Sequence, residues 1–174
     1  LWPCEVLVAA PAAASVQPAR TDFATGNDKR ANEIAASLVL VTFDMPFSVA
    51  GITERNYHGT GIVVDAERGL VVVDRNTVPV AAGDVRLTFG GSIEVPGKVE
   101  YVHPLHNLSV VSFDPQALDG TPIRAVKFDT RELEPGEPVT VVGLGGDSRL
   151  RSLATNVATM DDVNFPLSRT LQFR

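Results

Sequence analysis

The feature that most constrains the fold is a run of apolar, β-branched segments separated by polar corners between residues 58 and 113. Gly59-Thr60-Gly61 opens a segment at 62–64, a turn is expected over 65–69, and a second segment runs back over 70–73. A five-residue connection ending in glycine between two such segments is typical of a β-hairpin. The stretch therefore predicts antiparallel β structure. Further strands are expected at 85–89, 95–102 and 108–113.

Composition limits the class of protein. A chain of 174 residues with 44% apolar residues is long enough for one globular domain with its own core. The formal net charge of -6 argues against non-specific nucleic-acid binding, which needs a clustered basic face. No run approaches the roughly 20 apolar residues of a membrane-spanning helix. We expect neither a nucleic-acid partner nor a membrane span.

Cysteine and histidine give little support for a metal or cofactor site. The single Cys4 excludes an internal disulfide and a cysteine-based zinc site. His103 and His106 would need a carboxylate from elsewhere to bind a metal, and a turn that carries two partly exposed imidazoles is the favoured interpretation. We therefore expect no metal and no cofactor.

The remaining segments flank this β-rich region. Residues 1–27 are rich in Ala and Pro and are interpreted as a connector or the tail of a preceding region. A short helix capped by Asn27 or Asp28 is expected to reach Ala36, followed by a strand at 38–43. After residue 113 come a link and further strands at 139–143, 152–160 and 170–173.

Two quoted stretches carry a resemblance to a known family. The segments GLVVVDRNTVPV and EVPGKVEYVHPLHNLSVVSFDP, in this order, resemble the HtrA/Deg family of trypsin-like serine proteases. More specifically, they look like the second, degenerate protease domain of the large Deg proteins of fungi and plants, which carry two protease domains and several PDZ domains. The match covers roughly residues 31–174.

The resemblance implies a fold and its domain limits. We expect an all-β, chymotrypsin-like double β-barrel whose first barrel is complete and whose second is truncated. Residues 28–118 would form the first barrel with its short helix, and residues 119–174 the link and the incomplete second barrel. The unpaired edges of such a barrel would need a companion segment to cover them.

The resemblance also identifies the positions where catalytic residues would stand. The family pattern Thr-Asn-x-His-Val-Val aligns with residues 73–78 and places Asn76 where the catalytic His belongs. The pattern Asp-Pro-x-x-Asp aligns with residues 103–107 and places Asn107 where the catalytic Asp belongs. The Gly-x-Ser-Gly segment with the nucleophile lies further along in the family, and no Ser of this chain occupies that setting.

These substitutions remove the chemistry of a serine protease. A carboxamide cannot accept the hydroxyl proton, and changing the Asp of a Ser-His-Asp triad to Asn lowers turnover about 10⁴-fold by itself. His103 or His106 as a substitute base is disfavoured, because residue 106 is expected to face away from residue 107 in an extended strand. We expect the amides of Asn76 and Asn107 to hydrogen-bond each other.

We compare three functions for this chain. The first is a catalytically dead scaffold or oligomerisation domain of a larger HtrA/Deg endopeptidase in protein quality control, as a trimer-based homo-oligomer or against other domains of the parent. The resemblance makes Phe23, Met45 and Phe47 candidate interface residues, with packing against the barrel as the alternative. The second is a module that binds peptides or unfolded clients in the inactive cleft. The third is an endopeptidase completed by a missing C-terminal segment.

Overall fold

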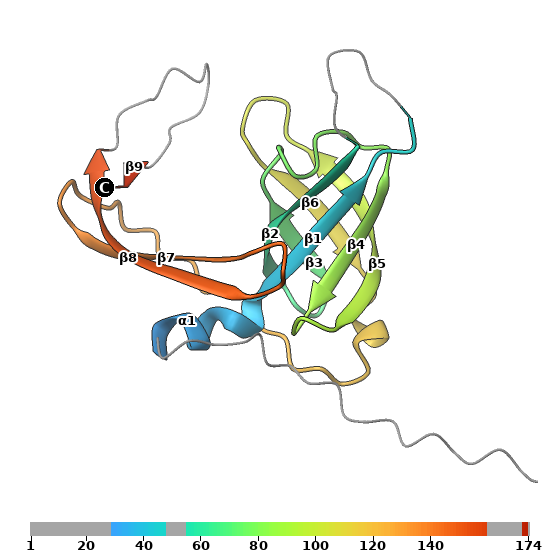
Figure 1. Cartoon of the computed structure of the whole chain (residues 1–174), viewed down its shortest axis with the longest axis horizontal. Coiled ribbons are helices and arrows are strands. Elements are labelled where there is room, and N and C mark those ends of the chain that lie inside the picture. Colours follow the sequence, from blue (N-terminus) through green and yellow to red (C-terminus); the bar gives the residue numbers. More distant parts are fainter. Residues whose placement is uncertain (1–28, 48–54, 160–171, 174) are drawn as a thin grey trace, which may run out of the picture.

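The computed structural model describes residues 29–47, 55–159 and 172–173 (Figure 1). It contains one α-helix, α1 (Lys29–Ile34), extended by a 3₁₀ turn over Ala35–Ser37, and a second 3₁₀ turn over Pro115–Leu118. The strands are β1 (Leu38–Asp44), β2 (Asn56–Asp65), β3 (Leu70–Val73), β4 (Asp84–Phe89), β5 (Ile93–Val102), β6 (Ser109–Phe113), β7 (Pro138–Leu144), β8 (Leu150–Thr159) and β9 (Gln172–Phe173).

The first six strands form a closed antiparallel barrel in the order β1-β2-β3-β6-β5-β4 (Figure 1). The predicted hairpin joins β2 to β3, and the Asp65 carboxylate accepts the backbone N–H groups of Glu67 and Arg68 at 3.1 and 2.9 Å. Gly69 ends this turn with a φ of 64°, a value that favours glycine. Closure gives each of the six strands a paired neighbour on both sides.

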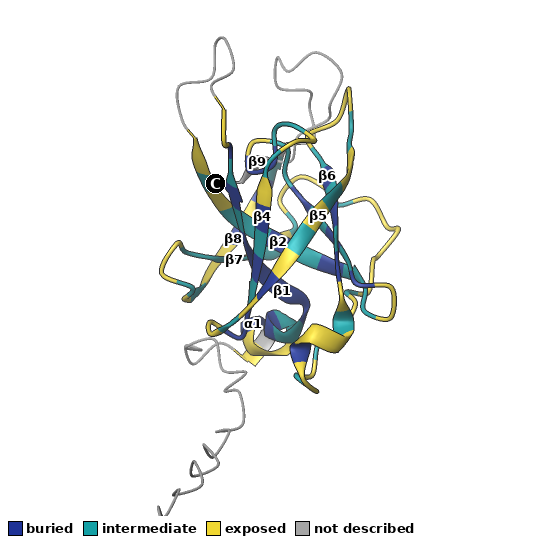
Figure 2. Ribbon diagram, turned by 90° about the vertical axis from the view of Figure 1, so that its right-hand side faces the viewer, coloured by how far each residue is buried: buried dark blue, intermediate teal, exposed yellow. Residues whose placement is uncertain are grey.

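The core lies inside the barrel (Figure 2), and on β4 and β6 buried residues alternate with less buried ones, whereas β1 is buried at four consecutive residues. On β4 the pattern is clear, since Val85, Leu87 and Phe89 are buried and the residues between them are not. Phe89 packs on Phe113 of β6 with ring centroids 4.9 Å apart. The strands were expected from their apolar, β-branched runs, and the barrel buries these residues.

The second sheet, β7-β8-β9, is open and extends away from the barrel (Figure 1). Its link to the barrel begins after residue 118 and crosses the first barrel, with Val126 N–H donating to Val63 C=O at 2.9 Å. Thr60 of β2 holds the near end of β7, because its Oγ1 accepts the Leu144 N–H at 2.7 Å and lies 3.3 Å from the Leu144 carbonyl. The exposed pair Val141 and Leu153 lies across this ribbon.

The expected fold is confirmed: the chain is all-β with a trypsin-like barrel, and each predicted strand is present. The helix ends two residues earlier than expected, at Ile34, because the chain tightens into a 3₁₀ turn before β1. Its proposed caps, Asn27 and Asp28, lie outside the described residues. No helix in the described part of the chain has the length and apolarity to cross a membrane.

The three candidate interface residues fall in different places. Met45 is 3% exposed and belongs to the barrel core, which is the packing role weighed against an interface. Phe47 is 43% exposed and available at the surface. Phe23 lies outside the described residues.

Candidate functional site

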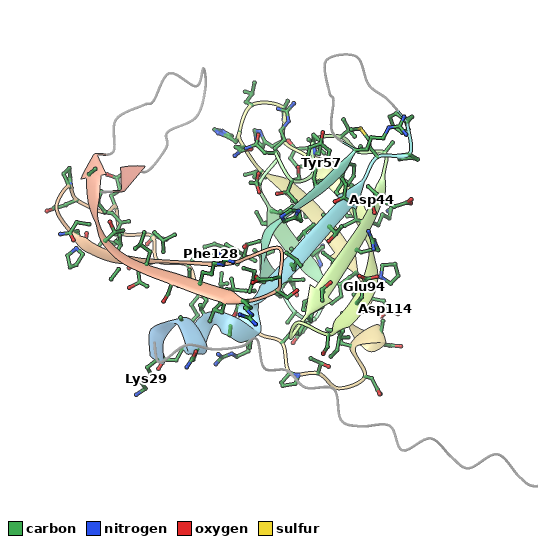
Figure 3. All side chains as sticks on the ribbon, in the orientation of Figure 1. Lys29, Asp44, Tyr57, Glu94, Asp114 and Phe128 are labelled. Carbon is green, nitrogen blue, oxygen red and sulfur yellow. The ribbon has the colours of Figure 1, made fainter. Side chains whose placement is uncertain are left out.

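The site is built from two corners at one end of the barrel. Val73 of β3 pairs with Ser109 of β6, so the segment that follows β3 and the segment that precedes β6 emerge side by side. The first segment carries Asn76 and the second carries Asn107, and both side chains are exposed. Figure 3 shows Tyr57 and Asp44 toward this end of the barrel and Asp114 toward the other.

The first corner is held by Asp74. Its carboxylate accepts the backbone N–H groups of Asn76 and Thr77 at 2.9 and 3.1 Å, and the Thr77 hydroxyl at 2.6 Å. An Asp that accepts amides two and three residues ahead closes a turn on itself. All of these bonds are local, so Asp74 here serves the turn.

Gly59 makes room for this corner. A Cβ built on Gly59 would lie 2.1 Å from the Thr77 hydroxyl oxygen, far inside any permitted contact. The first Gly of the Gly59-Thr60-Gly61 motif is thus required by close approach of the corner to β2. The buried Ser109 fixes the other side, because its hydroxyl donates to the Val78 carbonyl at 2.9 Å.

The second corner is the loop formed by residues 103–107. The side-chain oxygen of Asn107 accepts the backbone N–H of Arg75 at 3.0 Å. The Arg75 guanidinium donates to the carbonyls of His103 and Pro104 at 3.3 and 3.0 Å. The two corners are therefore bound to each other through Arg75, the neighbour of Asn76.

The expected bond between the two Asn side chains is not among the hydrogen bonds of the described residues. Asn107 instead satisfies its oxygen on the main chain of residue 75, which lies closer to it in the folded corner. Sequence reasoning missed this partner because a backbone amide is present at every position and leaves no signal of its own. The positions do lie together at one end of the barrel, as the resemblance requires.

The two imidazoles of the second corner contact groups within their own loop. Nδ1 of His103 accepts the N–H groups of Leu105 and His106 within its own loop, at 3.1 and 2.9 Å. The rings of His103 and His106 contact each other, with centroids 4.5 Å apart. Within the described ranges no ion pair joins a His to a carboxylate and no group of three potential metal ligands occurs. Among the described residues, the polar groups of this corner therefore form turns, and neither imidazole is ion-paired with a carboxylate.

Comparison with known proteins places the chain in a family. It is 36% identical over 134 residues to the pro-apoptotic serine protease NMA111 of Pyricularia oryzae, an alignment that covers 77% of this chain and 13% of that protein. With the protein of the same name from Aspergillus oryzae it shares 33% identity over 169 residues, covering 95% of this chain and 16% of that one. A PDZ domain-containing protein of Schizosaccharomyces pombe is 35% identical over 136 residues, which are 78% of this chain and 14% of that protein. The chain thus spans only a small part of these relatives' length.

Solved structures agree on the fold. The crystal structure of Deg5 matches with a TM-score of 0.63 at 13% identity and covers 86% of this chain and 75% of that one. The inactive form of the Rv3671c protease matches with a TM-score of 0.57 at 14% identity, over 82% of this chain and 64% of that one. No protein-family model matches the sequence. Together with the all-β barrel, these similarities show that the chain belongs to the HtrA/Deg family of trypsin-like serine proteases.

Proposed function

We propose that this chain is a catalytically degenerate protease domain that serves as a scaffold or oligomerisation domain within a larger HtrA/Deg serine endopeptidase of protein quality control. The observation that carries the proposal is the presence of Asn76 and Asn107 in two adjacent corners bound through Arg75. These are the positions at which the resemblance requires a base and its carboxylate. A carboxamide supplies neither role at neutral pH.

The surrounding groups support the loss of chemistry. Asp74 in the first corner and His103 in the second are titratable acceptors, and both use their acceptor atoms to close their own turns. A proton shuttle needs a base with a free acceptor directed at the nucleophile. Neither residue meets this condition in the folded corner.

Reaction with an active-site probe tests the catalytic half of the proposal. The full 174-residue chain is incubated with a fluorophosphonate, beside an active trypsin-like protease as positive control. We expect no labelling of the chain under conditions that label the control completely. This result would exclude a self-sufficient triad within residues 1–174, and the same reaction with the larger protein tests an endopeptidase completed by a further segment. Labelling that is abolished by His103→Gln or His106→Gln would show that an imidazole acts as base, and would favour the active endopeptidase.

Sedimentation tests the scaffold half. We expect the chain to associate in analytical ultracentrifugation as its concentration rises, and Phe47→Ser to weaken this association. Phe128→Ser is the matched control, because Phe128 is also an exposed aromatic, at 72% against 43% for Phe47. A monomer at all concentrations would contradict an oligomerisation role through this chain.

The free edge of β7 favours peptide binding as a second candidate function. The Leu144 N–H bonds to Thr60 outside the sheet, so the even-numbered residues of β7 direct their backbone groups away from β8. Thr140 and Val142 therefore present N–H and C=O groups for which the described residues supply no backbone partner. Pro138, without an N–H, fits the start of such an edge. An extended peptide could add a strand there.

Titration with denatured casein separates this candidate from the scaffold. If β7 accepts a peptide strand, Val142→Pro should reduce binding, because it removes an outward N–H without removing a bond to β8. Leu153→Ser on β8 is the control, because Leu153 is exposed and its replacement should leave the edge of β7 intact. Far-UV circular dichroism checks that both variants retain the fold. If the unsubstituted chain does not bind casein, peptide binding is rejected as its function.

A further inference from the structure

The loop at residues 103–107 is closed by a histidine used as an acceptor. Nδ1 of His103 accepts the backbone N–H of Leu105 at 3.1 Å and that of His106 at 2.9 Å. An imidazole nitrogen can accept only when it carries no proton. The closed loop therefore requires the neutral ring, with its hydrogen on Nε2.

Elsewhere in the described chain, aspartate performs this task. The carboxylates of Asp65 and Asp74 each accept the amides two and three residues ahead, at distances between 2.9 and 3.1 Å. A carboxylate keeps its charge throughout the neutral range, whereas a histidine changes charge between about pH 5 and 8. Position 103 is thus a turn of the aspartate kind that is closed by an imidazole in place of a carboxylate.

In the described structure, the His103 ring lies against two other rings, and its carbonyl accepts a hydrogen bond from a guanidinium. The groups packed against it are Tyr101, whose ring meets it edge-on with centroids 5.7 Å apart, His106 at 4.5 Å, and the cationic Arg75, which binds its carbonyl. None of the ion pairs formed by the described residues brings a carboxylate to either imidazole. Protonation of the His103 ring would add a positive charge that lies beside Arg75 and beside a second titratable ring.

Opening of the loop at residues 103–107 would affect both corners, because Arg75 joins them. The Arg75 guanidinium holds the carbonyls of His103 and Pro104, and the Arg75 N–H holds Asn107. We propose that His103 is a proton-sensitive closure of this loop: its neutral ring fixes residues 103–107 against the corner at Asp74–Thr77 near neutral pH, and its protonation in mild acid releases them. The device does not depend on whether the domain is degenerate, since it uses no catalytic group.

Amide exchange and NMR titration of the full chain between pH 8 and 5 test this closure. We expect the Leu105 and His106 amide resonances to shift together with the protonation of the His103 ring. Their exchange, corrected for the intrinsic effect of pH, should accelerate on the order of tenfold as the two bonds are lost. The Glu67 and Arg68 amides, held by Asp65, are internal controls and should not change.

Two variants separate His103 from its neighbour. His103→Asn and His103→Asp keep an acceptor for both amides and remove the titrating ring, so the loop should remain closed down to pH 5. His106→Gln removes the other imidazole and should leave the transition in place. The proposal is overturned if the Leu105 and His106 amides stay protected while His103 becomes protonated. It is equally overturned if the transition survives in both His103 variants.

Discussion

At the scale of single residues, close contacts between the backbone and neighbouring side chains explain why β2 carries two glycines. Gly59 and Gly61 both lie on β2, and a Cβ at Gly61 would come within 2.6 Å of Val71 and 2.7 Å of Val41 in the core. At Gly59 the obstacle is the Thr77 hydroxyl, which is already bonded to Asp74. Both glycines of this motif are therefore required because no side chain fits: Gly61 faces the core, and Gly59 lies against the corner that carries Asn76.

Replacing Gly59 by alanine should disturb that corner. We expect Gly59→Ala to lower the free energy of unfolding by about 1–3 kcal/mol, since the added methyl must displace Thr77. Gly143→Ala is the matched control, because its Cβ would meet Thr60 Oγ1 at an ordinary 3.4 Å. Urea denaturation measures both variants. Equal stability of the two would contradict the steric argument.

A second prediction concerns the carboxylate of Glu137. Arg131 donates two hydrogen bonds to it, at 2.7 and 2.9 Å, and the Glu134 N–H adds a third at 3.1 Å. These bonds lower the pKa of Glu137 below its usual value of 4.5, with Arg131 as the largest cause. A lowered pKa in the folded state stabilises the fold above the unfolded value, and this contribution is lost as pH falls through the folded pKa.

Titration of Glu137 by NMR checks the cause. In Arg131→Gln the pKa of Glu137 should rise toward 4.5, and the stability that the pair contributes above that pH should decrease. Arg149→Gln removes an arginine that pairs with Asp147 instead and should leave the Glu137 pKa where it was. No change in Arg131→Gln would assign the shift to the Glu134 amide.

At the scale of elements, the contact between β2 and β7 links the barrel to the open sheet. Thr60 reaches both backbone groups of Leu144 with one hydroxyl. The tip of the β7–β8 hairpin also lies close to the barrel, since a Cβ at Gly146 would come within 2.8 Å of the His58 ring. The far end of the ribbon extends away from the barrel (Figure 1).

Removing this hydroxyl should loosen the ribbon and leave the barrel intact. In Thr60→Val we expect exchange of the Leu144 amide to accelerate on the order of tenfold, with the loss of its part-buried hydrogen bond to the Thr60 hydroxyl. Amides of β1 should keep their protection. Thr42→Val on β1 is the control, because its hydroxyl has no hydrogen bond in the described structure. Faster exchange across the whole barrel would show that Thr60 has a wider role.

The sequence predicted elements better than their contacts. The barrel strands were recognisable as apolar, β-branched runs between polar corners, because the closed barrel buries those side chains in its core. The bond from Asn107 to the Arg75 main chain was not predictable, because it depends on how two loops meet after folding. Met45 likewise follows β1 directly, and only the fold shows that it enters the core. The domain limits at 27/28 and 118/119 stay predictions.

At the scale of the whole molecule, stability resides in the first barrel. Its buried side chains form one cluster from Val39 to Leu118, with partly buried residues packed against it. The second sheet contributes Val157 as a buried residue and leaves Leu153 63% exposed. The chain therefore combines one complete core with one sheet that is open in the described structure.

Paired core and surface substitutions test this division. We expect Leu87→Ala, which removes a fully buried side chain from the barrel, to cost about 2–5 kcal/mol. Leu153→Ala on the ribbon should change stability by no more than about 0.5 kcal/mol. Thermal or urea unfolding of the full chain compares them. A large cost at Leu153 would mean that the ribbon is packed in solution.

The outer edge of β7, which pairs with no other strand of the described structure, also bears on the solubility of the protein. Its sequence, PVTVVGL, carries no charged residue, whereas edge strands that resist aggregation commonly carry lysine or another charge. Concentrated samples should therefore thicken or precipitate with time through this strand, and a lysine introduced on its outward side is the first change to make for crystallisation or long storage.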